Sequence, residues 1–438
     1  MRCRFPYGLF LVISLGLAQG CGRKPAGSEP RWTRWTWGGR ADQEAHVSWE
    51  GDRQDKAWVE LEREPGVVER IQARPTCRRN SEGDPSLECT YRSAVQGLHP
   101  SRSYRFRPVL ANGATAGAWH ELRTSPSPDA CNPMRIVVVG DSRGRLSLPF
   151  ETPWLLSTYW PSILKSIVSE RPAALFHMGD IVADGRRFFY WRAWMDASIP
   201  SLEKLAFLPV VGNHEILEGP PASSFYPTLL APPSRSPGLS WRVQAGRVLF
   251  VGLDTESIPV SKQLSWLEDT LRESIGIADF RIVLAHRPLF SSGLHGSNPE
   301  GKYKMEEIMP ILERYQVDLF FVAHDHSYER IDPLHFNAAT GQVEAHRLDE
   351  SGGEGYPGVL FVTAGAGGAP AYAVEGCKVT GCVMTSSLQH YVVLDVLKDR
   401  IEATVRNMGP YGGPVQSRPL TTPLDRFILR KKSPRCGL

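Results

Sequence analysis

Five short apolar runs in this chain each lead to a side chain that can bind a metal ion, and this pattern constrains the fold more than any other feature. The runs are Val137–Val139, Ala174–Phe176, Leu208–Val211, Arg281–Ala285 and Leu319–Ala323, and the residues that follow them are Asp141, Asp180, Asn213 with His214, His286, and His324 with His326. Short apolar runs bounded by glycine are typical of strands buried on both faces. Because α/β sheets place ligands at the carboxyl ends of their strands, we expect these side chains to converge.

Segments of helical length separate several of these runs, which favours βαβ units around a largely parallel core. Ser157–Glu170 and Lys262–Glu273 are examples. Ser240–Asp254 is predicted to form two strands joined at Gly246, and Tyr391–Arg406 to add further sheet. We therefore predict a layered α/β domain with mixed sheets for residues 133–438.

The N-terminal part of the chain has a different pattern. Over residues 31–124, apolar and polar side chains alternate in short stretches separated by glycine and proline, which is typical of a small antiparallel sandwich. Gly97–Tyr104 resembles the turn before the sixth strand of a fibronectin-type domain, and Trp119–Thr124 resembles its last strand. The proline-containing segment Ser125–Asp129 is a stiff linker. A chain of 438 residues is longer than one core normally serves, so two domains are expected. The first shows no catalytic cluster, so a structural or orienting role is expected for it.

The first residues have the pattern of an export signal. Arg2 and Arg4 give a positive start, and Leu9–Leu17 is apolar but too short to span a bilayer. Leu17–Cys21 resembles a bacterial lipobox, with residues 1–20 removed, Cys21 lipidated and residues 21–30 a polar tether. An ordinary secretory signal cut nearby is the alternative. We expect an exported protein, anchored to a bacterial membrane through Cys21 or otherwise periplasmic or secreted.

The cysteine content fits export. Apart from Cys3 and Cys21 the chain has an even set: Cys77, Cys89, Cys131, Cys377, Cys382 and Cys436. Cysteines in oxidising compartments tend to pair. Nearness in sequence favours Cys77–Cys89 and Cys377–Cys382 and leaves Cys131–Cys436, although sequence alone keeps other pairings open.

Several motifs together resemble the calcineurin-like metallophosphoesterases. They are Gly179-Asp180, Gly212–Glu215, His286 and Ala323–His326. The extension Ser327–Arg330 resembles the purple acid phosphatase branch, which also has a fibronectin-like domain ahead of the catalytic domain. The resemblance covers nearly the whole mature chain. It implies a metallophosphoesterase-type β-sandwich flanked by helices, preceded by an all-β sandwich.

The resemblance also implies roles for the residues at the strand ends. Asp141 and His326 would hold a first metal ion, Asp180 would bridge, and Asn213, His286 and His324 would hold a second ion. His214 would bind substrate phosphate, and His295 would protonate the leaving group. Carboxylate, amide and imidazole ligands suit Fe, Mn or Zn without separating them.

Two residues depart from the family pattern. Arg143 stands where the family has His or Gly two positions after the first Asp, and Ala183 stands where the purple branch has a Tyr. Loss of the tyrosine makes a pair of divalent ions more plausible than a ferric centre. Arg143 is expected either to contact the phosphate through its planar guanidinium or to pair with Asp141 or Asp180.

The resulting hypothesis is an exported dinuclear enzyme that hydrolyses phosphate monoesters by attack of a metal-bridging hydroxide. A phosphodiesterase acting on cyclic nucleotides or other diesters is the alternative. A third hypothesis, from a different functional class, is a non-catalytic surface binding module whose site has decayed. The formal net charge of +3 is too small to indicate nucleic-acid binding, and the sequence does not specify the oligomeric state.

Three further features are expected to be structural. Asp254 follows a strand but lies outside the family pattern. Ala364–Ala369 is glycine-rich, yet no helix pattern follows it, so a close-packed strand end beside the site is favoured over a nucleotide-binding loop. The aromatic stretch Phe188–Trp191 with Trp194 is predicted to be a buried helix face, with lining of the cleft as the alternative.

Overall fold

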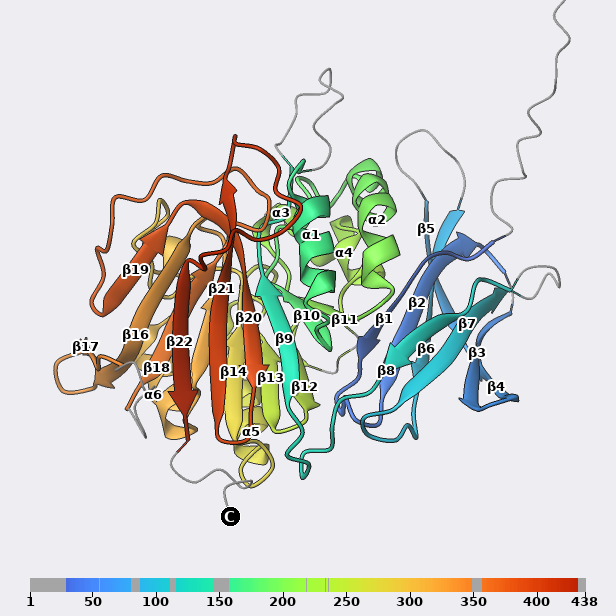
Figure 1. Cartoon of the computed structure of the whole chain (residues 1–438), viewed down its shortest axis with the longest axis horizontal. Helices are drawn as coiled ribbons and strands as arrows, with labels where there is room; N and C mark the ends of the chain where they lie inside the picture. Colours follow the sequence, from blue (N-terminus) through green and yellow to red (C-terminus); the bar gives the residue numbers. More distant parts are fainter. Residues whose placement is uncertain are drawn as a thin grey trace, which may run out of the picture.

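The computed structural model describes residues 29–431, except for positions 55, 80–86, 111–115, 145–156, 218, 233, 235 and 349–356. The chain folds into an N-terminal pair of small antiparallel sheets and a larger α/β part built on two mixed sheets (Figure 1). The predicted signal (residues 1–20), Cys21 and most of the tether lie outside the described residues. No helix among the described residues is long and apolar enough to cross a membrane.

The N-terminal part contains two four-stranded sheets, ordered β1-β2-β6-β5 and β4-β3-β7-β8. The strand bounds are β1 Arg31–Trp37, β2 Ala45–Asp52, β3 Ala57–Glu64, β4 Val67–Gln72, β5 Arg74–Arg79, β6 Leu87–Val95, β7 Ser103–Leu110 and β8 His120–Arg123. Alternate residues of both sheets point inward around Trp37, Trp49 and Phe106, each at most 1% exposed. This is the sandwich that the alternating pattern predicted.

The turn before β7 is fixed by a tyrosine. The amide of His99 donates to the Tyr104 hydroxyl at 2.8 Å, which ties the turn back onto the strand that follows it. Cys77 and Cys89 pair across the neighbouring strands β5 and β6, as their nearness predicted.

The first sheet of the larger part has the order β11-β10-β9-β20-β21-β22. Its bounds are β9 Met134–Val139, β10 Ala174–His177, β11 Ala206–Pro209, β20 Leu388–Val396, β21 Arg400–Pro410 and β22 Asp425–Arg430. β9, β10 and β11 run parallel, whereas β20 joins β9 antiparallel. The carboxyl ends of β9, β10 and β11 therefore lie at one edge.

The second sheet has the order β12-β13-β14-β15-β18-β16-β17, with β19 paired to β16. Its bounds are β12 Trp241–Ala245, β13 Val248–Gly252, β14 Phe280–Leu284, β15 Leu319–Val322, β16 Tyr328–Asn337, β17 Gln342–Ala345, β18 Val359–Ala364 and β19 Cys382–Ser386. The central strands β13, β14, β15 and β18 are parallel and the outer pairings are antiparallel. The predicted hairpin around Gly246 is confirmed as β12 and β13.

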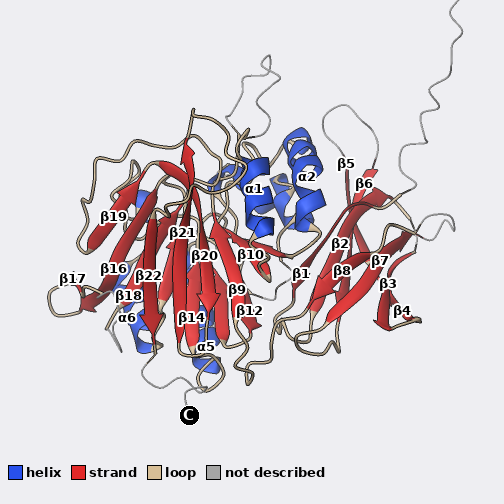
Figure 2. Ribbon diagram, in the orientation of Figure 1, coloured by secondary structure: helices blue, strands red, loops and turns tan. Residues whose placement is uncertain are grey.

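The two sheets pack face to face, and helices cover their outer faces (Figure 2). Phe176 of β10 stacks on Phe250 of β13 with ring centroids 4.3 Å apart, at the centre of the shared core. The helices are α1 Trp160–Ser169, α2 Phe188–Leu202, α3 Asn213–Ile216, α4 Tyr226–Leu229, α5 Leu264–Glu273 and α6 Met305–Arg314, with short 3-10 turns at Pro221–Ser223, Val260–Lys262 and Pro299–Gly301. Helices α1 and α2 pack on the first sheet, and α5 and α6 on the second. The predicted α/β fold class is confirmed.

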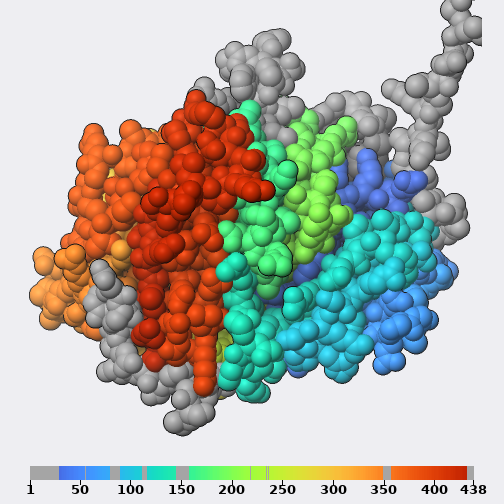
Figure 3. All heavy atoms as spheres, in the orientation of Figure 1, coloured from blue at the N-terminus to red at the C-terminus, as the bar shows by residue number. Residues whose placement is uncertain are grey.

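The two parts of the molecule lie against each other, with the N-terminal sandwich beside the segments drawn in green (Figure 3). Arg34 of β1 is central to this contact. Its Nε donates to the carbonyl of Leu229 in α4 at 3.2 Å, and its guanidinium pairs with Glu50 at 2.9 Å. Glu50 also accepts from the Thr90 hydroxyl at 2.6 Å. Burial raises the pKa of Glu50, and the charge of Arg34 opposes that rise.

The sequence analysis did not predict β1, β4, β5, β16, β17, β19 and β22. β4 is exposed along most of its length, so it lacks the alternation that marks the other strands. Cys377 and Cys382 form the second predicted disulfide. Cys131 is disulfide-bonded as well, and its predicted partner Cys436 lies outside the described residues. The domain boundaries proposed from the sequence stay predictions.

Replacing Arg34 with alanine is expected to lower the free energy of unfolding by about 3 kcal/mol, because the buried Glu50 carboxylate then lacks its ion-pair partner and, among the described residues, keeps only the hydrogen bond from Thr90. The control is Arg242→Ala, which breaks an exposed pair with Glu273 and should cost less than about 1 kcal/mol. Urea unfolding of both variants and the parent measures the difference. Equal losses in the two variants would contradict a stabilising role for the Arg34 contact.

Candidate metal centre

Three of the predicted ligands stand at strand ends where the backbone turns sharply. Asp141, Asp180 and His324 have φ angles of 55°, 55° and 69°, in the left-handed region that is uncommon for residues other than glycine. Each follows a parallel strand, respectively β9, β10 and β15. Backbone strain of this kind persists where the surrounding structure fixes it, and it concentrates at functional sites.

Asp180 lies at the middle of the cluster and is 1% exposed. Its Oδ1 accepts from the amide of His214 at 3.0 Å and lies 3.4 Å from Nε2 of His286. Its Oδ2 accepts from Nε of Arg143 at 3.2 Å and lies 3.9 Å from Nε2 of His214. The two carboxylate oxygens therefore face two different groups of side chains.

On the Oδ1 side, two imidazoles and an amide oxygen converge. Oδ1 of Asn213 lies 2.9 Å from Nε2 of His286 and 3.0 Å from Nδ1 of His324. His286 donates from Nδ1 to the carbonyl of Met178 at 2.8 Å, so its Nε2 presents a lone pair to the cluster when the ring is neutral.

On the Oδ2 side, Asp141 and His326 approach each other. Oδ1 of Asp141 lies 3.4 Å from Nε2 of His326, and His326 donates from Nδ1 to the carbonyl of Pro370 at 2.6 Å. Oδ2 of Asp141 accepts from the amide of His324 at 3.0 Å. Oδ1 of Asp141 is buried and accepts no hydrogen bond from the described residues.

The donor set fits a metal centre. Asp141, Asp180 and His286 are buried, and their ligand atoms lie within 4.8 Å of one another. A buried carboxylate oxygen without a hydrogen-bond partner is costly unless a cation compensates it. The second nitrogens of His286 and His326 are fixed by backbone carbonyls, which is the arrangement that orients metal-binding imidazoles.

Burial and neighbouring charges set the protonation states. Burial raises the pKa of Asp141 well above its usual range, and the Asp180 carboxylate adds to the rise, although the charge of His286 opposes it. Burial also acts to raise the pKa of Asp180, but His286, His214 and Arg143 outweigh it and hold that pKa well below its usual range. Burial lowers the pKa of His326 to about 4 and also lowers that of His324. The last two rings are therefore neutral near pH 7, the form that binds metals.

Arg143 and His214 flank Asp180. Arg143 pairs with Asp180 rather than with Asp141, which is one of the two roles expected for it, and its terminal nitrogen lies 3.5 Å from Nε2 of His326. His214 donates from Nδ1 to the carbonyl of Ala183 at 2.7 Å. Ala183 thus contributes its backbone at the position where the purple branch has a tyrosine.

His295 lies next to the cluster and is oriented by a carboxylate. Oδ1 of Asp325 lies 2.9 Å from Nδ1 of His295 and also accepts from the His295 amide at 2.9 Å. The ring of His295 packs on His324 with centroids 4.1 Å apart. Its Nε2 is therefore the nitrogen available for proton transfer.

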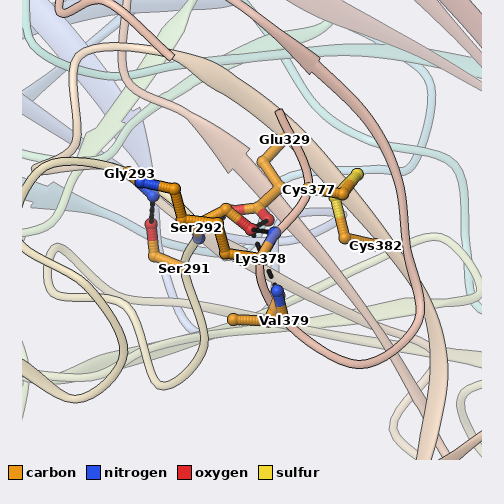
Figure 4. The surroundings of a disulfide bond; sticks show 8 residues. All are labelled: Ser291, Ser292, Gly293, Glu329, Cys377, Lys378, Val379 and Cys382. Atoms are coloured by element: carbon orange, nitrogen blue, oxygen red, sulfur yellow. Dashed lines mark hydrogen bonds between the residues drawn. A yellow bond between two sulfur atoms is a disulfide. The ribbon is translucent and has the colours of Figure 1, made fainter. Parts of the chain in front are cut away.

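The loop that carries His295 is held by the segment around the second disulfide (Figure 4). The hydroxyl of Ser292 accepts from the amide of Lys378 at 2.8 Å, inside the loop closed by Cys377 and Cys382. The same hydroxyl donates to Glu329 at 2.6 Å, and the Ser292 amide donates to the other oxygen of Glu329 at 2.8 Å.

Sequence reasoning assigned no role to three residues of the site. Asp325 stands between the two histidines of their motif, so its position could have marked it. Glu215 accepts four backbone N–H groups from the loops after β10 and β11. Tyr372 stacks on the ring of His326 with centroids 4.2 Å apart and planes at 11°, and no motif surrounds it. Burial raises the pKa of Tyr372 to about 12.

The three features expected to be structural are so in the fold. Asp254 accepts from the amides of Leu239, Glu256 and Ser257 and organises a loop. The aromatic stretch forms the buried face of α2, with Phe188, Tyr190, Trp191 and Trp194 buried. The glycine-rich segment follows β18 and packs against the centre. A Cβ on Gly365 would lie 2.8 Å from Oδ2 of Asp141 and 2.2 Å from the Asp325 carbonyl oxygen.

Comparison with known proteins agrees with this geometry. Residues 134–328 match the calcineurin-like phosphoesterase family. The chain is 24% identical over 313 residues to probable inactive purple acid phosphatase 1 of Arabidopsis thaliana, covering 63% of this chain and 48% of that protein. It is 26% identical over 285 residues to a nucleotide pyrophosphatase/phosphodiesterase of Hordeum vulgare, covering 57% of this chain and 72% of that protein.

Among solved structures, purple acid phosphatase PPD1 from yellow lupin (Lupinus luteus) seeds superposes with a TM-score of 0.76 at 20% identity, covering 94% of this chain and 76% of that chain. The chain spans about half the length of several curated relatives that it matches. Through residues 134–328 the chain is similar to the calcineurin-like metallophosphoesterases, and it is similar to proteins of their purple acid phosphatase branch.

Replacing Gly365 with alanine is expected to lower metal retention at least about tenfold, because the new Cβ overlaps the Asp325 carbonyl oxygen and the Asp141 carboxylate and displaces both. Changes in the groups around a metal ligand reduce metal affinity by about 10–100-fold. Gly39→Ala is the control, since the atom of the described residues that its new Cβ would approach is a side-chain oxygen of Glu44, at 3.9 Å. Elemental analysis after desalting measures the bound metal. Equal metal content in both variants would show that Gly365 does not shape the centre.

Proposed function

We propose that this protein is a metal-dependent hydrolase of phosphate esters that prefers monoesters. The observation that carries the proposal of a metal-dependent hydrolase is that Oδ1 of Asp180 and Oδ1 of Asn213 both lie close to Nε2 of His286, at 3.4 and 2.9 Å. Nδ1 of His324 lies 3.0 Å from the same Asn213 oxygen. Such a set of oxygen and imidazole donors suits Fe, Mn or Zn.

Two ion positions follow from the two sides of Asp180. Asp141, Asp180 and His326 would hold the first ion, and Asp180, Asn213, His286 and His324 would hold the second. Bound ions would supply an acidified water as the nucleophile and neutralise charge on the phosphoryl group.

Two residues of this chain are placed to bind the phosphate. Arg143 offers a planar guanidinium beside Asp180, suited to a bidentate contact with phosphate oxygens. His214 keeps its Nδ1 proton on the Ala183 carbonyl, so its Nε2 is the nitrogen that faces the centre. Burial lowers the pKa of His214, and a bound phosphate dianion would favour the protonated, donating ring.

His295 is the proposed proton donor to the leaving oxygen. Asp325 holds Nδ1 of His295 and would stabilise the imidazolium, which leaves the Nε2 proton for transfer. The burial of Asp325 and its bond from the Ser291 hydroxyl at 2.5 Å keep this carboxylate in place.

Two other functions have an observation in their favour. The likeness to a protein named nucleotide pyrophosphatase/phosphodiesterase supports diester hydrolysis as the second candidate. The likeness to a protein named probable inactive purple acid phosphatase, with the departures at Arg143 and Ala183, supports a non-catalytic binding module as the third.

The disulfides are typical of a protein exported to an oxidising compartment. Attachment to a membrane through lipid on Cys21 is proposed from the lipobox-like motif.

Replacing Asp180 with asparagine is expected to remove bound metal and to lower turnover of an aryl phosphate monoester by more than about a hundredfold. Substitution of residues that only support a metal ligand already lowers metal affinity or activity by up to about that factor. The control Asp269→Asn changes an exposed aspartate that pairs with Arg272 and should change neither quantity. Elemental analysis and hydrolysis of matched aryl monoester and diester substrates measure both. Wild-type turnover in Asp180→Asn would contradict the proposal. Faster hydrolysis of the diester than of the monoester by the parent would favour the phosphodiesterase.

Replacing His295 with asparagine is expected to slow hydrolysis of an alkyl phosphate by about a hundredfold or more, because an alkoxide needs a proton as it leaves. Hydrolysis of a nitrophenyl phosphate should slow far less in the same variant, because its leaving group is a weak base that needs no proton. His335→Asn, at a half-exposed histidine that pairs with Glu313, is the control. Steady-state turnover on both esters measures the ratio, and equal losses on the two substrates would remove His295 from the proton-transfer role.

A further inference from the structure

Arg143 contacts the same atoms that the proposed first ion would use. Its Nε donates to Oδ2 of Asp180 at 3.2 Å, and its terminal nitrogen lies 3.5 Å from Nε2 of His326. The Arg143 side chain is 12% exposed and that of Asp180 is 2% exposed. The guanidinium therefore lies inside the cluster and is not a solvent-facing partner at its rim.

The proposed second position is different. Oδ1 of Asp180 accepts from the His214 amide, and Oδ1 of Asn213 faces the rings of His286 and His324. Among the described residues, no lysine or arginine hydrogen bonds to either of these oxygens.

A guanidinium cannot leave its site by losing a proton, because it stays charged at every pH relevant to proteins. An ion can reach Oδ2 of Asp180 and Nε2 of His326 only if the whole Arg143 side chain moves away. That movement breaks a charge-assisted hydrogen bond in a buried setting. The free energy of metal binding at this position is therefore less favourable by the free energy needed to break that hydrogen bond.

Ala183 is an independent reason to expect weaker metal binding at the first position. Ala183 is fully buried and offers its carbonyl to His214. Its methyl side chain cannot bind a metal on the Oδ2 side of Asp180. The proposed ligands on that side are therefore three, Asp141, Asp180 and His326. The proposed ligands on the Oδ1 side are four, Asp180, Asn213, His286 and His324.

We propose that Arg143 and a metal ion compete for the first position, so that the centre binds its two ions with unequal affinity and retains one. The inference rests on the proposed function, since it needs a centre that binds metal. When an ion takes the first position, the displaced guanidinium is free to pair with a phosphate oxygen.

The first test uses the full chain loaded with excess Mn²⁺, desalted, and measured by elemental analysis and electron paramagnetic resonance. Wild type is expected to retain about one manganese per chain, with the spectrum of isolated ions. Arg143→Gly should retain about two, with the spectrum of exchange-coupled ions. Arg143→Lys keeps a cation at this position and should stay nearer one.

The matched control is Arg186→Gly, because Arg186 also pairs with an aspartate on the loop after β10, at 3.0 Å from Asp184, but lies outside the cluster. It should retain the wild-type content of manganese. Two coupled ions in wild type, or one ion in a folded Arg143→Gly, would overturn the inference.

A second measurement needs no variant. Calorimetric titration of metal-free wild type with Mn²⁺ should give two binding steps that differ in affinity at least about tenfold, the factor expected when one step breaks a charge-assisted hydrogen bond. Two steps of equal affinity would contradict the competition but leave the proposed hydrolase intact. No binding in any arm would remove the proposed function together with this inference.

Discussion

The arrangement of the site depends on one buried carboxylate, that of Glu215. Glu215 accepts the amides of Asp180 and Gly212 on one oxygen, at 2.8 and 2.7 Å, and those of Ile181 and Val182 on the other, at 2.8 and 3.2 Å. These bonds fasten the loop after β10 to the loop after β11. Burial raises the pKa of Glu215 to about 8 with help from the Asp180 charge, while the N–H donors favour the ionised form. Asp180 and Asn213 lie beside the same nitrogen of His286 because this carboxylate holds both loops.

The charges of the centre explain the arrangement around it. Asp141 and Asp180 are buried close together, and two carboxylates in such a setting need cationic compensation. Arg143 supplies part of it from one side. The neutral rings of His324 and His326 add ligand atoms without adding charge. The cluster therefore combines potential metal-binding groups with a permanent organic cation, which distinguishes it from the family pattern of His or Gly at the position of Arg143.

Much of this could be predicted from the sequence, because strand ends and metal ligands coincide in order along the chain. The five apolar runs became β9, β10, β11, β14 and β15, and the predicted ligands lie together at their carboxyl ends. What could not be predicted depends on side-chain direction and on long-range packing. From the sequence, either Asp141 or Asp180 could be the ion-pair partner of Arg143, and only the structure shows that the partner is Asp180. Tyr372 reaches His326 from a loop after β18 that carries no motif.

The left-handed backbone at Asp141, Asp180 and His324 also limits which ligands these positions can carry. Aspartate, asparagine and histidine are several-fold enriched in that conformation relative to other residues, whereas bulky or β-branched residues are outliers there. Exchanging one of these ligands for a longer or branched side chain would therefore strain the strand end before it altered the coordination. The chain thus restricts the side chains of this cluster through main-chain geometry, whereas Asn213 and His286 do not have this conformation and are not restricted in the same way.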